Sequence, residues 1–328
     1  MRSKAEVLER LALSLRLLGR DPNTLESYGR TAGKYYDFSL TCPREWTSER
    51  IAEAYLSQRV TRDDVSASTQ NHDLEAINAL YASVGKKLGN VDALRAKRPQ
   101  YARHCPTTAE FLALVGELHD TPAAPVRLVA LYLAACGLRI NEALEARLKD
   151  FRREGDQLHF VVRDPKQAHD RWVPIPAMLW RALRQQANYA RLVFRSDNAR
   201  RAPLPLQTPR ALAKKYPRAP HTIGWAFLFP SPNPMNHPVT GQPVRWHLPD
   251  YDVQHAFSRA CDRLEAAGRI FARLTPHHLR HWYGTHFAGD IRDLQELMGH
   301  RSIETTAIYR HPQLDRAVSP LAALALRV

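Results

Sequence analysis

The chain has 328 residues, of which 44% are hydrophobic and 24% charged, so it has enough apolar material for the cores of two globular domains. Lys and Arg number 47 against 33 Asp and Glu, and the net charge of +14 favours a polyanionic partner, above all nucleic acid, although a membrane surface also fits it. The four cysteines form no CxxC pair, which argues against a zinc ribbon and a disulfide scaffold and predicts a reducing cytoplasm. No apolar run approaches the about 18 residues of a membrane span, and charged residues interrupt the apolar start, so we expect neither a membrane helix nor a signal peptide.

The first hundred residues predict a helical domain. Asp21, followed by proline, and Thr47 are typical helix starts. Apolar residues recur at helical spacing, which predicts helices at 4–18, 23–38, 47–59 and 68–85. The basic segment that follows has two prolines and no apolar period, as is typical of a linker. We therefore expect an N-terminal domain over residues 1–102 and a second domain over residues 103–328.

The second domain predicts further helices around a small sheet. The segments DQLHFVVRD and RWVPIP alternate as strands around the loop PKQAHD, and GLRINEAL predicts a turn and a short helix. The stretch 195–222 is rich in Pro and Arg without a strong period, and loops of this length are usually functional or disordered. Helical patterns recur at about 107–119, 123–136, 176–191, 249–268, 276–288, 291–298 and 302–310. The fold class predicted is mainly α with a small antiparallel β-sheet.

The segment LTPHHLRHWYGTH carries the first candidate site residues. Thr275 and Pro276 are a favourable N-cap and first helical residue. His277 and Arg280 then lie on the same side of the first turn, where an imidazole beside a guanidinium can bind an oxyanion. Such residues more often cap or solvate a helix, so the pair alone does not identify a site.

Further candidates are scattered along the second domain. Arg139 follows a Cys-Gly turn, and Glu142 is spaced to hold it by an ion pair, although a plain surface salt bridge is the alternative. Lys166 lies in the predicted hairpin loop, where a lysine is usually only solvated. His300 follows a glycine between two predicted helices, and Tyr309, by itself, would be an amphipathic packing residue.

Together these residues form a phosphoryl-transfer set without carboxylate ligands for a metal. The motifs GLRINEAL, HHLRHWYGTH and LQELMGHRSIETTAIYRH resemble the boxes of the tyrosine recombinases, the lambda-integrase superfamily. The segments VSASTQNHDLEAINALY, ALAKKYPRAPHTIGWAFLFPSP and SPL are similar to the integron integrases in particular. The resemblance covers nearly the whole chain and is strongest in the second domain.

The resemblance implies a helical SAM-like core-binding domain that clamps DNA, followed by a tyrosine-recombinase catalytic domain with an insertion near 195–230. It implies cutting and rejoining of DNA through a 3′-phosphotyrosyl intermediate, with no metal or other cofactor. The implied catalytic set is Tyr309 as nucleophile, Arg139, Arg280 and His300 on the phosphate, His277 as proton acceptor, Lys166 as general acid and Glu142 orienting Arg139.

The integron likeness also implies partners. It implies duplex and folded single-stranded DNA sites, and a chain that is a monomer when free and a homotetramer on DNA, linked by the tail SPLAALALRV. Trp225, in the string WAFLF, fits the core as well as it fits a stacking role. The candidate DNA contacts are Lys214, Lys215, Arg218, Trp225, Trp246 and His247.

Two alternatives remain open. One is a Xer- or phage-type recombinase that acts only on duplex sites, against which the insertion argues. The other is a DNA-binding relative with impaired catalysis, because GTHFAGDIRDLQELMGH is a few residues shorter than the family pattern ahead of His300.

Overall fold

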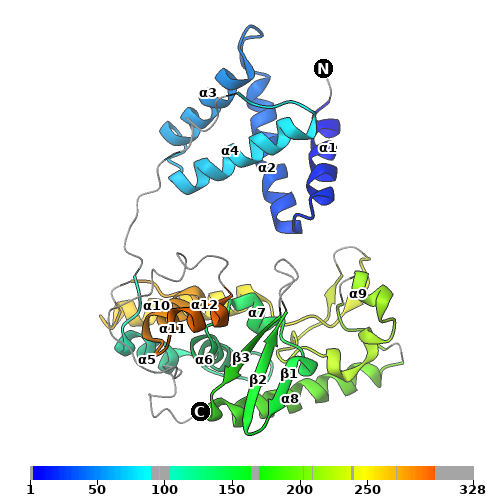
Figure 1. Cartoon of the computed structure of the whole chain (residues 1–328), viewed down its shortest axis with the longest axis vertical. Helices are drawn as coiled ribbons and strands as arrows, with labels where there is room; N and C mark the ends of the chain where they lie inside the picture. Colours follow the sequence, from blue (N-terminus) through cyan, green and yellow to red (C-terminus); the bar gives the residue numbers. More distant parts are fainter. Residues whose placement is uncertain are drawn as a thin grey trace. The chain divides into compact units, whose positions relative to one another are not determined.

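The computed structural model describes residues 3–89, 96, 104–163, 170–201, 203–208, 210–237, 240–270 and 272–299. The chain divides into two compact units, Met1–Ala102 and Arg103–Val328 (Figure 1). Lys166, His300, Tyr309, the predicted helix at 302–310 and the C-terminal tail lie outside the described residues.

The first unit is helical, as predicted. Each helix begins after a Ser, Thr or Asp whose side-chain oxygen accepts a hydrogen bond from a backbone N–H in the first turn. The first N–H groups of a helix have no carbonyl partner within the helix, so this side chain supplies one. The N-caps are Ser3, Asp21, Thr47 and Ser66. The helices are α1 (Lys4–Leu17), α2 (Pro22–Ser39), α3 (Ser48–Thr61) and α4 (Ala67–Ser83).

The core of this unit is built around α4. Leu74 and Ile77 are fully buried and pack against Leu11 of α1 and Leu56 of α3. The buried carboxylate of Asp73 accepts from Thr31 Oγ1 at 3.1 Å and from Arg59 Nε at 2.9 Å. A buried charge with such partners is compatible with an apolar surrounding.

The second unit combines helices with two small antiparallel sheets. Three strands, in the order β1-β2-β3, form the larger sheet, and β4 and β5 form the smaller one. The elements are α5 (Thr108–Glu117), α6 (Val126–Cys136), α7 (Ile140–Leu144), β1 (Phe151–Glu154), β2 (Gln157–Val162), β3 (Arg171–Ile175), α8 (Ala177–Asn198), α9 (Arg210–Lys215), β4 (Met235–Asn236), β5 (Pro243–Val244), α10 (Asp250–Ala266), α11 (Pro276–His286) and α12 (Ile291–Met298). This architecture confirms the predicted fold class.

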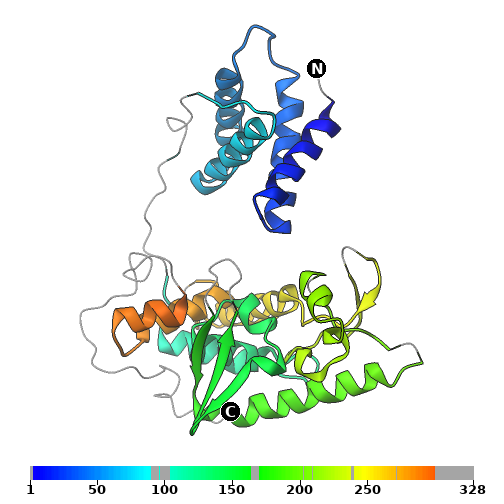
Figure 2. The same cartoon turned by 45° about the vertical axis from the view of Figure 1, so that its right-hand side comes forward.

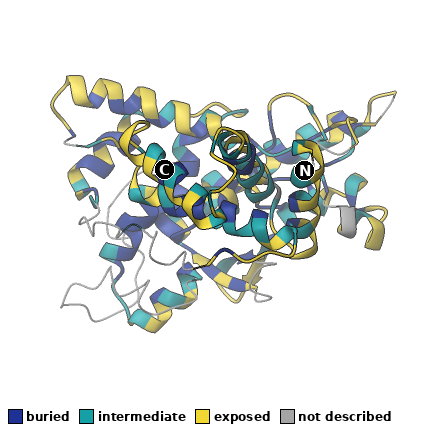
Figure 3. Cartoon of the chain, turned by 90° about the horizontal axis from the view of Figure 1, so that it is seen from above, coloured by how far each residue is buried: buried dark blue, intermediate teal, exposed yellow. Residues whose placement is uncertain are grey.

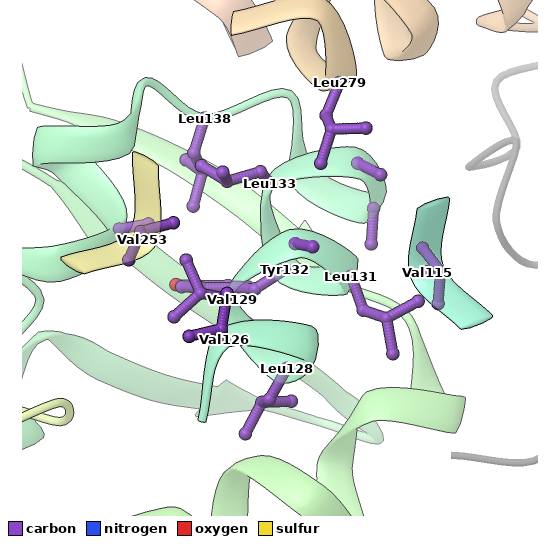
Figure 4. Packing of buried hydrophobic residues seen from close by; sticks show 14 of the residues in the cluster. Val115, Val126, Leu128, Val129, Leu131, Tyr132, Leu133, Leu138, Val253 and Leu279 are labelled. Carbon is purple, nitrogen blue, oxygen red and sulfur yellow. The ribbon is translucent and has the colours of Figure 1, made fainter. Parts of the chain in front are cut away.

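Helix α6 lies at the centre of the second core. All but one of its residues are buried, as expected of a helix that is apolar all round (Figure 4). Helix α11 packs against α6, and Trp282 of α11 stacks on Phe111 of α5 at a centroid distance of 4.4 Å. By contrast, most helices carry both buried and exposed residues along their length (Figure 3).

Two predictions of local structure were incomplete. The predicted strand pair is present as β2 and β3, but a third strand that we did not predict, β1, pairs with β2 with Phe151 opposite Phe160. The remaining residues of β1, RRE, are exposed and charged, so the segment has no apolar alternation to reveal a strand. Helix α8 runs on to Asn198, past the predicted end near 191, and extends from the sheet toward the segment that contains α9 (Figure 2).

Candidate active site

Arg139 is positioned by the sharp turn that ends α6. Gly137 has φ +61°, a left-handed conformation, and a Cβ there would lie 2.4 Å from Cδ1 of Tyr283. Only glycine meets both conditions. Arg139 is then the N-cap of α7, and Glu142 accepts from its backbone N–H at 2.8 Å and from its Nη1 at 2.7 Å.

Arg280 comes from α11, which begins as predicted with Thr275 as N-cap followed by Pro276. The side chain is 2% exposed. Its Nη1 donates to Gly137 O at 2.6 Å, and its Nη2 donates to Met298 O at 2.5 Å. Nη1 also lies 3.8 Å from Glu142 Oε2, so Glu142 connects the arginines of α7 and α11.

A third arginine, Arg171 at the start of β3, joins the same carboxylate. Its Nη2 donates to Glu142 Oε2 at 2.7 Å, and its Nε donates to Leu297 O at 2.9 Å. Burial opposes ionisation of Glu142, but the charge of Arg171 and the hydrogen bonds around it outweigh burial and lower the pKa of Glu142. We call Glu142 with Arg139, Arg171 and Arg280 the Glu142 cluster.

The Glu142 cluster carries more positive than negative charge. One carboxylate faces three guanidiniums, and the side chain of Arg139 remains 42% exposed. A forked guanidinium at such a place can accept a phosphate with charge-assisted hydrogen bonds. Chemically, the cluster is therefore suited to holding an oxyanion on which charge develops.

His277 stands at the first turn of α11, one turn before Arg280. It is exposed, and its ring lies edge-on to that of His281 with centroids 4.5 Å apart. Of the six predicted catalytic residues, the structure describes Arg139, Arg280 and His277, and it brings the two arginines together on Glu142.

The predicted aromatic DNA contacts line one cavity of about 410 Å³. Trp225, Trp246 and His247 lie along it, and Glu142 lines it as well, so the cavity adjoins the Glu142 cluster. We call it the Trp225 cavity. Burial lowers the pKa of His247, whose Nδ1 lies 2.8 Å from Leu248 O.

Two cations that we did not predict shape the Trp225 cavity. Arg147 is 9% exposed; it donates to Trp225 O at 2.7 Å and lies 4.0 Å above the ring of Phe227. Lys149 Nζ lies 3.1 Å from the ring centroid of Trp225. Trp225 is half-buried, so it is neither a full core residue nor an open stacking platform.

The three predicted basic DNA contacts lie elsewhere. Lys214 and Lys215 are exposed at the end of α9, and Arg218 is exposed just beyond it. None of the three lines the Trp225 cavity. Within the described residues no group of three or more His, Cys, Asp or Glu side chains is placed to hold a metal ion. None of the helices described is long and apolar enough to span a membrane.

A signal for Arg171 was present in the sequence. Arg171, Val173 and Ile175 alternate on the buried face of β3. A charged residue in register with two inward apolar residues needs a buried partner, which marks it as a member of a polar site. Arg147 and Lys149 carried no comparable signal, because their partners come from a distant, irregular segment.

Comparison with known proteins shows the family. Residues 107–316 match the model of the phage integrase family, and residues 7–89 match its N-terminal SAM-like domain. An integrase/recombinase of Escherichia coli is 33% identical, over 93% of this chain and 89% of that protein. The tyrosine recombinase XerA of Pyrococcus furiosus is 26% identical, over 93% and 89% of the two chains.

Solved structures show the same fold. XerH recombinase bound to a palindromic difH substrate aligns with a TM-score of 0.61 at 17% identity, over 94% of this chain and 80% of that one. A lambda integrase dimer bound to a core site aligns with a TM-score of 0.61 at 17% identity, over 95% and 98% of the two chains. With the family model matched over most of its length, this chain belongs to the phage integrase family of tyrosine recombinases.

Proposed function

We propose that this tyrosine recombinase cuts and rejoins DNA at specific sites through a 3′-phosphotyrosyl bond to Tyr309. The phenolic oxygen attacks the scissile phosphorus, the bond from phosphorus to the 5′ oxygen breaks, and a free 5′-hydroxyl leaves. The bond energy is retained in the intermediate, so a 5′-hydroxyl can reverse the step and rejoin the strand without ATP.

Each further residue of the set has one role in this step. Arg139 and Arg280 bind the nonbridging oxygens as charge develops on them, and His300 adds a donor. His277 accepts the proton of Tyr309, and Lys166 donates one to the leaving 5′ oxygen. Glu142 orients Arg139. The positive surplus of the Glu142 cluster is the observation that supports this assignment most strongly.

A nicked suicide duplex tests the proposal, because loss of a short fragment after cleavage traps the covalent adduct. The wild-type chain should form an adduct that runs above the free protein on a denaturing gel, and Tyr309→Phe should form none. A wild-type chain without adduct would support the catalytically impaired alternative. An adduct in Tyr309→Phe would overturn the nucleophile assignment.

We further propose an integron-type substrate, a folded single strand with extrahelical bases, besides the duplex. The Trp225 cavity favours this reading, because flipped bases bind to aromatic rings and edge donors. Lys149 covers Trp225, so a base that stacks there must displace the ammonium, which can then pair with a phosphate. Lys214, Lys215 and Arg218 are proposed as backbone contacts.

Binding to two matched DNAs separates the substrate classes. A folded strand with an extrahelical base should bind more tightly than the same hairpin without it, and Trp225→Ala should remove that difference. Equal binding would favour a Xer-type, duplex-only recombinase, and one of the relatives is named a tyrosine recombinase XerA.

The assembly is also a proposal. We expect a monomer in free solution and a homotetramer on paired sites, linked by the tail SPLAALALRV, in the bacterial cytoplasm. Light scattering with and without DNA measures both states, and removal of the tail should leave site binding intact but prevent the tetramer.

A further inference from the structure

Arg171 lies outside the six-residue set, yet it contacts two elements on which the proposed chemistry depends. It donates to Glu142 Oε2 at 2.7 Å and to Leu297 O of α12 at 2.9 Å. The side chain is 8% exposed. Both donations go to protein groups beside the proposed catalytic arginines, so Arg171 can act on the chemistry through the residues that it holds.

The end of α12 is held by arginines over three consecutive residues. The last carbonyl groups of a helix lack partners within the helix and carry partial negative charge. A guanidinium suits these carbonyl groups because it donates hydrogen bonds to them and carries a positive charge. The pairs are Leu297 O with Arg171 at 2.9 Å, Met298 O with Arg280 at 2.5 Å and Gly299 O with Arg139 at 3.5 Å.

Gly299 allows this contact. It ends α12 with φ +61°, and a Cβ there would lie 2.8 Å from Nη1 and 3.2 Å from Cζ of Arg171. The guanidinium therefore packs directly on the backbone that immediately precedes His300. Any side chain at this position would push Arg171 away from Glu142 or move the chain.

The charge of Arg171 also decides how Glu142 is shared. Oε1 of Glu142 accepts from the Arg139 guanidinium, and Oε2 accepts from Arg171 Nη2 and from the backbone N–H of Arg139. Arg280 Nη1 is left at the longer distance of 3.8 Å from Oε2. Without Arg171, Arg280 is the nearest guanidinium that can pair with Oε2 of Glu142. A guanidinium drawn onto a carboxylate is less available to a phosphate, because the two anions compete for the same donors.

We propose that Arg171 is a positioning residue of strand cleavage. It holds Oε2 of Glu142 and the end of α12 together, and thereby keeps Arg280 off the carboxylate and available to the scissile phosphate beside Arg139. It also ties β3, the strand that follows Lys166 in the sequence, to the residues that precede His300. This inference rests on the proposed function.

The test measures single-turnover cleavage of the nicked suicide duplex, expressed per DNA-bound protein so that misfolded molecules do not count. Arg171→Gln should bind the duplex normally and cleave about 10- to 100-fold more slowly, less than the about 10²- to 10³-fold loss on removing a direct oxyanion donor. Arg171→Lys should be intermediate, since an ammonium keeps the charge but cannot reproduce the fork. Gly299→Ala should also cleave slowly although it removes no hydrogen-bond donor, because its Cβ would displace Arg171. Arg184→Gln, at an exposed arginine of α8, is the matched control.

A second substrate separates positioning from general loosening of the fold. A methylphosphonate at the scissile position removes the charge that Arg139 and Arg280 bind. The defect of Arg171→Gln should then shrink, whereas a loosened fold would give the same defect on both substrates.

Three outcomes would overturn the inference. One is cleavage by Arg171→Gln as fast as by Arg184→Gln, and another is an equal defect on both substrates. In both cases the wild-type adduct leaves the proposed function standing. The third is the absence of any wild-type adduct, which removes the proposed function and this inference together.

Discussion

Asp197 and Glu142 are two carboxylates of the same unit that arginines hold in opposite ways. Asp197 is 2% exposed, and Arg245 meets it with two parallel hydrogen bonds of 2.7 Å each. The remaining nitrogen of Arg245 donates to Ser231 O at 2.9 Å, so each nitrogen of this guanidinium has a partner. Glu142 instead faces three guanidiniums, and one of them is 42% exposed.

The difference lies in the arginine that makes the short contacts, which is 5% exposed for Arg245 and 42% exposed for Arg139. Asp197 and Arg245 satisfy each other's hydrogen bonds and fasten the end of α8 to the residue after β5 and to the segment after Phe229, while Arg200 adds only a longer contact of 3.5 Å. The Glu142 cluster keeps a positive surplus at the surface, which an incoming phosphate can neutralise. Breaking the first should therefore cost stability, and breaking the second should cost catalysis.

The largest effect is expected from Arg245→Ala. It leaves the Asp197 carboxylate buried without its main partner and should lower the free energy of unfolding by about 3–5 kcal/mol. Arg200→Ala is the matched control, because Arg200 also contacts Asp197, at 3.5 Å, from a side chain that is 49% exposed. The control should cost about 0–1 kcal/mol. Urea denaturation measures both, and equal costs would show that the Asp197–Arg245 pair is not a stabilising contact.

Arg280→Ala should slow catalysis, whereas Arg245→Ala should reduce stability. It removes a donor to the transition state and should slow single-turnover cleavage by about 10²- to 10³-fold, or roughly 3–4 kcal/mol of barrier. Site binding, measured by fluorescence anisotropy, should change far less. Near-normal cleavage by the DNA-bound variant would remove Arg280 from the catalytic set and with it the contrast to Arg245.

Gly137→Ala tests how strongly the Glu142 cluster depends on its turn. The new Cβ would lie 2.4 Å from the Tyr283 ring at a residue with φ +61°, so we expect a stability loss of about 1–3 kcal/mol. Gly241→Ala has φ +68° with nothing within 4 Å and should cost only about 1 kcal/mol of backbone strain. Cleavage should fall in Gly137→Ala alone, because Gly137 O accepts from Arg280. Identical thermal shifts would show that the ring contact contributes nothing.

The smallest effect is a pH dependence carried by Glu142. Its pKa in the folded chain is below the ordinary value of 4.5, so the folded state favours the carboxylate more than the unfolded state does. The stabilisation is therefore complete above pH 4.5 and is lost as pH falls through the lowered pKa. Urea denaturation of the wild type and Glu142→Gln across this range should show curves that converge on the acid side. Parallel curves would mean that Glu142 gains nothing from its arginines.

Much of the fold could be read from local patterns. The N-caps Ser3, Asp21, Thr47 and Ser66 and the apolar spacing behind them act within one or two turns, so the four helices of the first unit were predictable. Strand β1 was not, because its charged residues are placed by pairing with β2 and not by an apolar face of their own.

In the candidate site, too, some features follow from local sequence and others only from tertiary packing. The sequence by itself determined the helices, the motif spacings and the residue types that point to phosphoryl transfer, since each of these is written in neighbouring residues. Only the tertiary structure decided that Arg139 of α7, Arg171 of β3 and Arg280 of α11 share one carboxylate and the last carbonyls of α12. Arg139 and Gly299 are 160 positions apart, and no local pattern encodes such a contact. It exists because α6 and α11 pack in a single core, which sets the distance between the chain segments that carry the charges.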